Sequence, residues 1–294
     1  METFILFEQK MEFELLRILI AVLGTTIAAY YDIFNKKNIP EKFLYAFLII
    51  SFLVNLLDIQ NLIPAVFYAL IVFLIFYILY RAGEVGGADG YILSSITLAL
   101  PYQPKIFLIF EGFFPLPFII NVFVFAAISF VVYVFLKTIK IVLKNFKIEK
   151  KNAIQSLIII FSYLILIYTI KENPIVLGLV SPQYILLLSV MVFLMTYYTL
   201  FKDIINNSMI EFVSVKEVEP EDMIAIEKMD INIVKKFDLK KLVTKEQYEK
   251  MKSIRGKKIA LYKHLPPFVP HILIGLIFGL FFGDLLTLLN NVFI

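Results

Sequence analysis

Long apolar runs alternate with short charged segments along this chain, a pattern typical of a protein that crosses a membrane several times. Charged residues or prolines bound eight such runs, at about 14–31, 43–57, 62–80, 90–101, 116–136, 153–170, 183–201 and 267–289. A helix needs on the order of 20 apolar residues to cross a bilayer. Because the second and fourth runs are shorter, we predict about 6–8 spans.

The composition is typical of a membrane protein and limits the kinds of catalytic and metal site that the chain can form. Hydrophobic residues make up 60% of the 294 residues, whereas a soluble domain is nearer half apolar. The chain has no cysteine and two histidines, His264 and His271. Disulfides and thiol catalysis are therefore excluded, and the histidines are too few for a histidine-built metal site. We expect no cofactor and no metal, and the lipid bilayer rather than nucleic acid as a partner.

The basic residues predict the orientation. With the N-terminus outside, all but four of the 28 Lys and Arg residues fall in the inner segments 32–42, 81–89, 137–152 and 202–266. Positive charge is retained in the cytoplasm. The run 14–31 lacks a small-residue cleavage site before the next charged loop, so we expect a permanent span and not a removed signal.

Residues 202–266 form the one stretch polar enough for a domain outside the membrane. Alternation in Met209–Val218 and Lys257–Tyr262 predicts strands. Thr244 is a typical N-cap for a helix through Met251, which we expect Gly256 to close.

The predicted fold is therefore an all-α polytopic membrane helix bundle with a small α+β cytoplasmic insert before the last span. We divide the chain into a helix bundle at 1–201, the insert at 202–266 and a final transmembrane helix at 267–294.

Two aspartates lie at junctions between spans and loops. Asp32 follows the first apolar run, and Asp89 ends the glycine-rich turn Gly83-Glu84-Val85-Gly86-Gly87-Ala88-Asp89. The predicted topology places both at the cytoplasmic face. Considered alone, Asp32 fits a solvated helix end, and Asp89 fits an N-cap of the fourth span. Together they indicate function, because ionisable groups at membrane depth are costly.

Two carboxylates that meet at such a boundary are the minimal equipment of an aspartic protease. One carboxylate is expected to hold the shared proton while the other activates water. The cytoplasmic ends of helices give access to the water that hydrolysis requires. We expect the glycines at 83, 86, 87 and 90 to allow positive φ angles and a close approach to another helix.

Two motifs resemble the type IV prepilin peptidase family of aspartic membrane proteases, and most closely its archaeal preflagellin and prepilin branch. They are Asp32 with the following Lys36-Lys37 and Ile39-Pro40, and Gly86-Gly87-Ala88-Asp89. The bacterial form of the second motif is Gly-x-Gly-Asp, and Ala88 replaces its second glycine. A third resemblance is the proline-rich start of the last span, Leu265-Pro266-Pro267-Phe268-Val269-Pro270.

The resemblance implies a GxGD-type aspartic endopeptidase in the cell membrane. Asp32 and Asp89 would be the catalytic pair, and the remaining site residues would be Gly86, Gly87, Ala88, Pro267, Phe268 and Pro270. The implied partners are preflagellins and type IV prepilin-like proteins, which carry a short basic leader before an apolar helix. The implied cut removes that leader at the cytoplasmic face.

Two alternatives remain open. A presenilin-like or signal-peptide-peptidase-like protease also uses two aspartates, but in consecutive spans, whereas two predicted spans separate Asp32 from Asp89 here. An ion-coupled transporter would use the carboxylates as a cation site, and would show midplane polarity and an internal repeat. Glu84 fits either a contact to the leader or a solvated loop glutamate, and we favour the latter. We expect His271 to be a satisfied polar group in its helix, and Asp58 and Asp284 to face outside.

Overall fold

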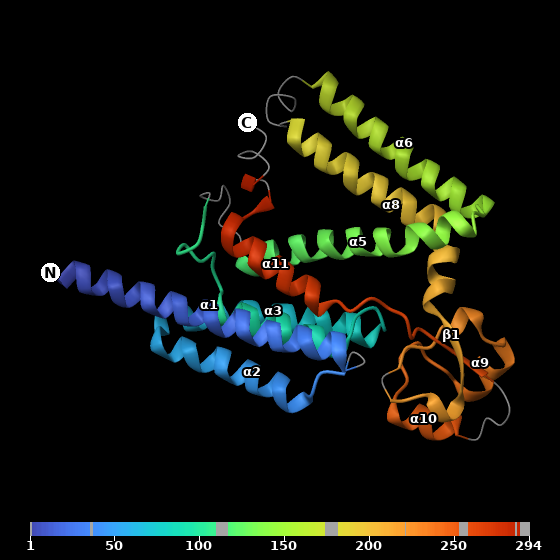
Figure 1. The fold of residues 1–294 in the computed structure, drawn as a ribbon, viewed down its shortest axis with the longest axis horizontal. Helices are drawn as coiled ribbons and strands as arrows, with labels where there is room; N and C mark the ends of the chain where they lie inside the picture. The colour runs from blue at the N-terminus through green and yellow to red at the C-terminus, as the bar shows by residue number, and fades with distance from the viewer. Residues whose placement is uncertain are drawn as a thin grey trace.

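Every predicted apolar run forms a helix. The computed structural model describes residues 2–35, 38–109, 117–173, 182–220, 222–252, 258–285 and 287–288. The helices of the membrane part are α1 (Glu2–Phe34), α2 (Glu41–Leu53), α3 (Ile59–Arg81), α4 (Gly87–Ala99), α5 (Phe118–Lys144), α6 (Lys150–Glu172), α8 (Pro182–Met209) and α11 (Val269–Phe282). The predicted helical membrane bundle is confirmed (Figure 1).

The helices differ in whether they can cross a bilayer by themselves. By length and composition, five of the described helices are able to do so: α1 over Glu12–Phe34, α3, α5, α6, and α8 over Ile185–Met209. Helices α2, α4 and α11 have 13, 13 and 14 residues, fewer than the roughly 20 that a span needs. The 3₁₀ turn Val54–Leu57 extends α2. The shortness predicted for the second and fourth runs is therefore seen, and α11 is also short.

Helix α4 is the centre of the bundle. It packs against α1, α2, α3 and α5, and its residues from Asp89 to Ala99 are buried except the half-buried Tyr91. Ile92, Leu93 and Ile96 have no exposed surface and join the main apolar core. Burial on all sides explains why a helix of 13 residues stays in place. The same packing holds the N-terminus of α4, which carries Asp89, in place.

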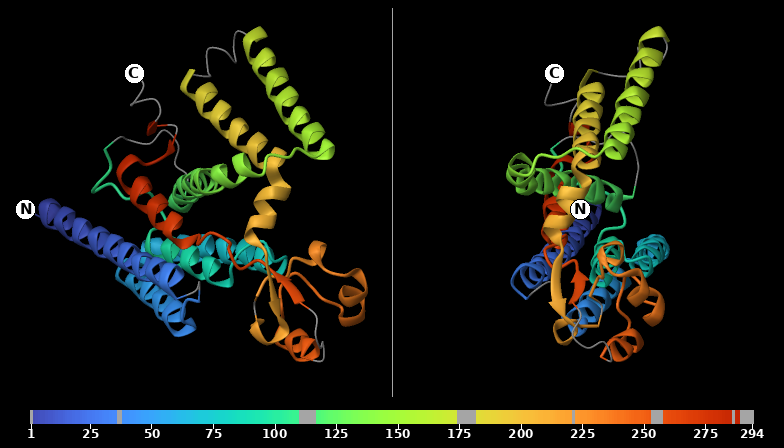
Figure 2. Two further views of the ribbon diagram at one scale, coloured as in Figure 1. Left: turned by 45° about the vertical axis from the view of Figure 1, so that its right-hand side comes forward. Right: turned by 90° about the vertical axis from the view of Figure 1, so that its right-hand side faces the viewer.

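Helices α6 and α8 pack on each other and project away from the layer of α1 to α4, as Figures 1 and 2 show. A hydrogen bond of 2.7 Å from Asn152 Nδ2 to Asp203 Oδ2 joins them, and α5 connects this pair to the rest. Helix α8 is kinked at Phe201, where φ is −108° and ψ is 16°. The kink coincides with the predicted boundary at residue 201, although the helix continues to Met209.

The insert contains one antiparallel pair of strands, β1 (Glu211–Ser214) and β2 (Lys258–Leu261), with Glu211 opposite Leu261 and Ser214 opposite Lys258. Both predicted strands are therefore present, although Lys257 lies outside the described residues. Buried side chains form a separate small core: Val213, Ile224, Met251, Ile259 and Leu261, among others. The insert also holds the 3₁₀ turns Val215–Glu217 and Ile226–Lys228 and helices α9 (Ile231–Phe237) and α10 (Lys245–Met251).

The predicted helix near residue 244 is confirmed as α10. Thr244 Oγ1 accepts a hydrogen bond of 3.2 Å from Gln247 N, and Gln247 Oε1 accepts one of 3.4 Å from Thr244 N. This reciprocal pair is a capping box, which satisfies two amides of the first turn. The helix ends at Met251, and Gly256 lies outside the described residues. Helix α9, which Asp230 caps, was not predicted.

Removing the cap of α10 is expected to loosen that helix. Thr244→Ala should cost about 1 kcal/mol, which corresponds to roughly fivefold more of the open form and fivefold faster limited proteolysis within Lys245–Met251. Thr244→Ser keeps an acceptor oxygen and should behave like the parent chain. Equal proteolysis of the Ala and Ser variants would show that the cap does not hold α10.

Candidate active site

Asp32 lies in the last turn of α1, where it meets the start of α11. Its side chain is buried, and its Oδ2 accepts a hydrogen bond of 3.0 Å from the backbone N of Val269. The first amides of a helix have no partner within that helix, and they favour a negative charge nearby. The contact therefore binds the end of α1 to the beginning of α11, 237 residues later in the chain.

The residues after Asp32 turn the chain toward α2. Asn35 Nδ2 donates a hydrogen bond of 2.6 Å to Asn38 O, Ile39 is buried, and Pro40 is the N-cap of α2. Lys36 and Lys37, which belong to the first motif, lie outside the described residues. The Ile39-Pro40 pair thus fixes the start of the next helix.

Asp89 is the third residue of α4. Its Oδ2 accepts a hydrogen bond of 3.0 Å from Gly86 N, while its own N donates one of 3.3 Å to Gly86 O. This reciprocal arrangement caps the helix with the aspartate side chain. The interpretation of Asp89 as the N-cap is therefore wrong in position: Gly86 is the N-cap, and Asp89 stands three residues later with its side chain on the Gly86 amide.

The two aspartates come together at one end of the bundle. Both line a single cavity of about 1980 Å³, and we call Asp32 and Asp89 the aspartate pair and this space the aspartate cavity. They are near enough for the charge of Asp32 to act on Asp89. Helix α1 ends and α4 begins on the side of the bundle that faces the insert (Figure 1).

The glycines of the second motif serve close packing more than unusual backbone angles. A Cβ at Gly86 would lie 3.2 Å from Asp89 Oδ2, and one at Gly87 would lie 3.2 Å from the ring of Tyr80. Gly86 has φ of −71°. Within the described residues of this turn, only Gly83 has a positive φ, at 70°. The expectation of positive φ angles is therefore wrong for Gly86, whereas the expected close approach is present.

Of the remaining predicted site residues, all but Pro270 line the aspartate cavity. Ala88, Pro267 and Phe268 line the aspartate cavity together with Gly86 and Gly87. Pro270 lies in the first turn of α11, where a proline loses no helical hydrogen bond, and it is not among the residues lining the cavity. It directly follows Val269, whose amide contacts Asp32.

Glu84 links the loop before α4 to the insert. Lys241 Nζ donates to Glu84 Oε1 at 2.7 Å, 157 residues away in sequence, and the Lys241 side chain also packs on Gly83. Glu84 is an exposed loop glutamate, as we expected, and it also forms an ion pair that was not predicted. Lys241 was missed, because no sequence pattern signals an ion pair across that distance.

A double-mutant cycle should show whether this ion pair steadies the loop. Both side chains are partly exposed, so their coupling is expected to be about 0.2–1 kcal/mol. Glu84→Gln and Lys241→Met should each raise amide hydrogen exchange in Ala82–Gly86 by up to about fivefold. The double variant should exchange its amide hydrogens little faster than either single variant. Lys241→Arg should exchange them as slowly as the parent chain. Additive effects of the two single changes would contradict a direct contact.

Other polar residues take structural roles. His271 Nδ1 lies 2.8 Å from Ser129 Oγ, so the expectation of a satisfied helix residue agrees with the structure. Asp58 Oδ2 pairs with Arg17 Nη2 at 3.5 Å, and Asp284 accepts a hydrogen bond of 2.8 Å from Thr287 N. Among the described lining residues of the aspartate cavity, neither Asp58 nor Asp284 occurs.

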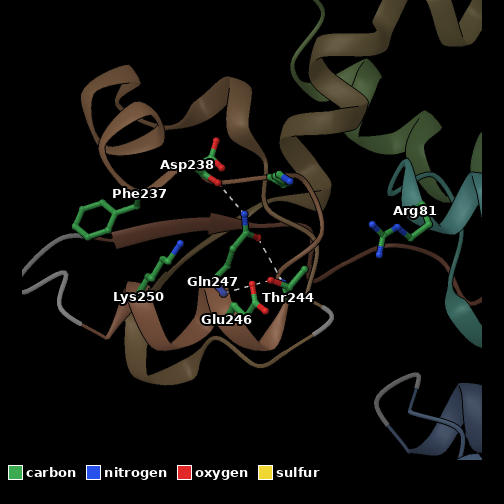
Figure 3. Close-up of a pocket in the computed structure, with 8 residues that line it drawn as sticks. Arg81, Phe237, Asp238, Thr244, Glu246, Gln247 and Lys250 are labelled. Atoms are coloured by element: carbon green, nitrogen blue, oxygen red, sulfur yellow. Dashed lines mark hydrogen bonds between the residues drawn. The ribbon is translucent and has the colours of Figure 1, made fainter.

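A second, smaller cavity lies on the insert (Figure 3). Its volume is about 440 Å³, and Arg81 reaches toward it from the end of α3. The hydrogen bonds of its walls are internal, such as the 2.7 Å contact from Gln247 Nε2 to Asp238 O. Neither aspartate of the pair lines it, so the candidate chemistry belongs to the larger cavity.

A comparison with known protein families matches the part of the chain that contains both aspartates. Residues 19–136 match the type IV leader peptidase family. No curated protein and no solved structure matched the chain. The matched segment runs from α1 into α5 and contains Asp32, Asp89 and the motif Gly86-Gly87-Ala88-Asp89. The resemblance to the type IV leader peptidases that the sequence motifs indicated is therefore confirmed over these residues.

Proposed function

We propose that the protein is a membrane-embedded aspartic endopeptidase with Asp32 and Asp89 as its catalytic residues. It removes the short basic leader from preflagellins or type IV prepilin-like proteins at the cytoplasmic face of the cell membrane. The observation that carries the proposal is the aspartate pair, since both side chains are buried and line the same cavity. The family match supports the peptidase activity.

The pair can divide the work of peptide hydrolysis. One carboxylate accepts a proton from water as the water oxygen attacks the carbonyl carbon of the scissile bond. The partner, which holds the shared proton, donates it to the carbonyl oxygen. The tetrahedral intermediate then collapses, the C–N bond breaks, and the leaving nitrogen takes up a proton. Such positioned proton transfers contribute roughly 10²- to 10⁴-fold to a rate.

Each carboxylate is positioned by one backbone amide. Val269 N holds Asp32 and Gly86 N holds Asp89, each at 3.0 Å. Both contacts use the Oδ2 atom of the aspartate. Because two interacting carboxylates titrate as a coupled pair, we assign the general base and the general acid to the pair and not to single residues.

The position of the pair supports a cut at the cytoplasmic headgroup level. The lysine-rich insert lies beyond the end of the bundle that holds the pair (Figure 1), and positive charge is retained inside the cell. A substrate with a basic leader and an apolar helix has its junction at the same depth. The aspartates would therefore meet the bond between these two parts.

Leader removal can be tested with the purified chain in proteoliposomes. An epitope-tagged prepilin-like protein should shorten, and mass spectrometry should find the new N-terminus between the basic leader and the apolar helix. A substrate without the leader is the control and should keep its size. If neither preflagellins nor prepilin-like proteins are cut, the proposal fails, and acid-dependent ion uptake into the vesicles would favour a transporter.

A further inference from the structure

The aspartate cavity extends far beyond the aspartates, along helices at membrane depth. Apolar side chains from three helices line this extension, and we call them the apolar groove: Phe73 and Phe76 of α3, Val131 and Phe135 of α5, and Leu194 and Met195 of α8. All three helices are able to span a membrane. The groove therefore lies where a lipid-embedded segment of another protein could reach it.

The size of the cavity suits a helix. The whole cavity, apolar groove and acidic end together, has the volume of a helical cylinder about 10 Å wide and about 25 Å long, which is roughly 17 residues at 1.5 Å per residue. That space is enough for part of a membrane-spanning helix, which has roughly 20 residues, together with a short leader. A short loop or a small ligand would leave most of the space empty.

The other end of the cavity is acidic. Among the residues that the structure describes, its lining has nine Asp and Glu side chains against four lysines and one histidine, although the whole chain has a net charge of +4. We call the acidic wall those carboxylates that come from the insert and the loop before α4: Glu84, Glu217, Glu219, Asp222 and Glu227. The cavity thus has an apolar part along the membrane helices and a negative part at the insert, and the aspartate pair also lies in its wall.

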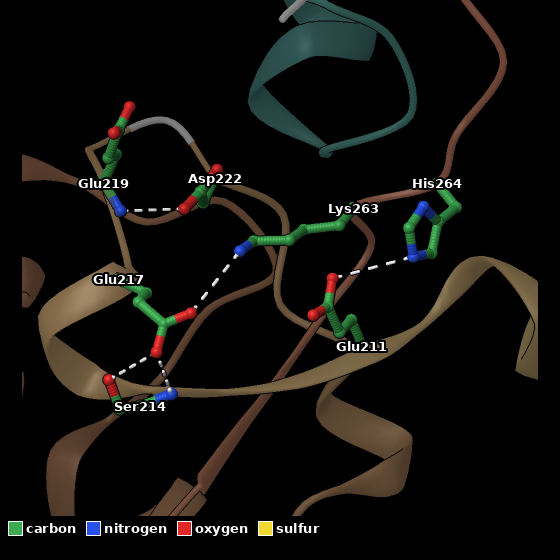
Figure 4. Close-up of polar contacts among 7 residues, drawn as sticks. All are labelled: Glu211, Ser214, Glu217, Glu219, Asp222, Lys263 and His264. Atoms are coloured by element: carbon green, nitrogen blue, oxygen red, sulfur yellow. Dashed lines mark hydrogen bonds and ion pairs between the residues drawn. The ribbon is translucent and has the colours of Figure 1, made fainter.

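In the part of the chain that the structure describes, the five carboxylates of the acidic wall outnumber the lysines that pair with them, which are Lys241 on Glu84 at 2.7 Å and Lys263 beside Glu217 (Figure 4). Hydrogen bonds from the side chain and the backbone N of Ser214, at 2.7 and 3.3 Å, lower the pKa of Glu217. Lys263 Nζ lies 3.8 Å from Glu217 Oε2, too far for a strong hydrogen bond. Burial raises the pKa of Asp222, whose Oδ2 accepts a hydrogen bond of 2.7 Å from Glu219 N.

We propose that the cavity takes the substrate as one unit, with its apolar helix in the apolar groove and its basic leader against the acidic wall. This inference rests on the proposed function and adds where each part of the substrate binds. The junction between a basic and an apolar segment would then lie where the walls change character, beside Asp32 and Asp89. Charge complementarity therefore sets the register of the cut.

Disulfide crosslinking can locate the substrate helix, since the chain contains no cysteine of its own. Val131 lines the cavity, whereas its neighbour Val132 is 38% exposed and does not. Val131→Cys and Val132→Cys would each be combined with Asp89→Asn, to keep the substrate whole, and with a single cysteine in the substrate helix. We expect the Val131→Cys variant to crosslink at least tenfold more than the Val132→Cys variant.

The outcomes separate the two proposals. Cleavage of the same substrate by the parent chain is measured in parallel and tests the function alone. If the substrate is cut but Val132→Cys crosslinks as well as Val131→Cys, the docking site is wrong and the peptidase activity stands. If the parent chain cuts no such substrate, both proposals fail.

The acidic wall is tested by kinetics with two substrates. Glu217→Gln with Glu219→Gln should raise KM about two- to fivefold for the basic leader, the range of exposed charge pairs, and leave kcat unchanged. The KM of a substrate whose leader lysines are replaced by glutamine should not change. Glu246→Gln, a residue of the insert outside this cavity, is the matched control. Equal KM changes for both leaders would contradict charge recognition.

Discussion

Asp32→Asn and Asp89→Asn are each expected to abolish leader removal while leaving the protein folded in the membrane. The loss should be at least about 10²-fold and up to 10⁴-fold, because asparagine neither accepts the proton of water nor donates an acidic one. Cleavage of a tagged substrate in proteoliposomes, followed over time, measures the loss. Either single change should be enough to abolish leader removal, because the two aspartates act as a unit.

The fold should tolerate these changes because asparagine keeps the structural hydrogen bonds. An amide oxygen at position 32 is still able to accept from Val269 N, and one at position 89 from Gly86 N. Asp230→Asn is the matched control: Asp230 caps α9 in the insert and accepts from Asn232 N at 2.9 Å. Asparagine is as good an N-cap as aspartate, so this variant should keep full activity. Cleavage that survives either change in the pair would overturn the mechanism.

The fold of the membrane part could be predicted because its cause is local. Each apolar run has to hydrogen-bond its own backbone in lipid, so it becomes a helix wherever the run occurs. The same reasoning predicted that the two aspartates lie together, because the number of spans between Asp32 and Asp89 places both at the same end of the helix bundle. In the insert, the Thr244 cap and the alternating strands were also local signals. Helix α9 has seven residues, too few for a clear periodicity.

What could not be predicted depends on contacts between distant parts of the chain. The Val269 amide on Asp32 and the Lys241 ammonium on Glu84 join residues 237 and 157 positions apart. Both partners also lie outside the segment 19–136 that matches the leader peptidase family. The proline-rich start of α11 was singled out, but only the fold shows that its free amide faces an aspartate. The matched segment therefore holds both aspartates, and the C-terminal part supplies the amide that positions Asp32.

Gly275→Ala should be the most damaging small change outside the aspartate pair. A Cβ at this position would lie 2.2 Å from Val122 O and 2.8 Å from Ala126 N, both backbone atoms of α5. Backbone atoms of a packed helix are unable to move aside singly, so α5 and α11 would have to separate. Overpacking of this kind costs about 1–3 kcal/mol, although alanine within an exposed helix would normally stabilise it by about 1 kcal/mol.

Activity should fall together with stability in this variant, because α11 begins six residues earlier at the amide that holds Asp32. Thermal unfolding in detergent, followed by circular dichroism, measures the first effect, and substrate cleavage measures the second. Gly279→Ala is the matched control one turn further along, where a Cβ would meet the ring of Phe118 at 3.0 Å. The ring needs to shift by only a few tenths of an ångström to make room, so this change should cost less. Equal losses for the two variants would show that close packing of α5 on α11 does not set the position of the aspartate pair.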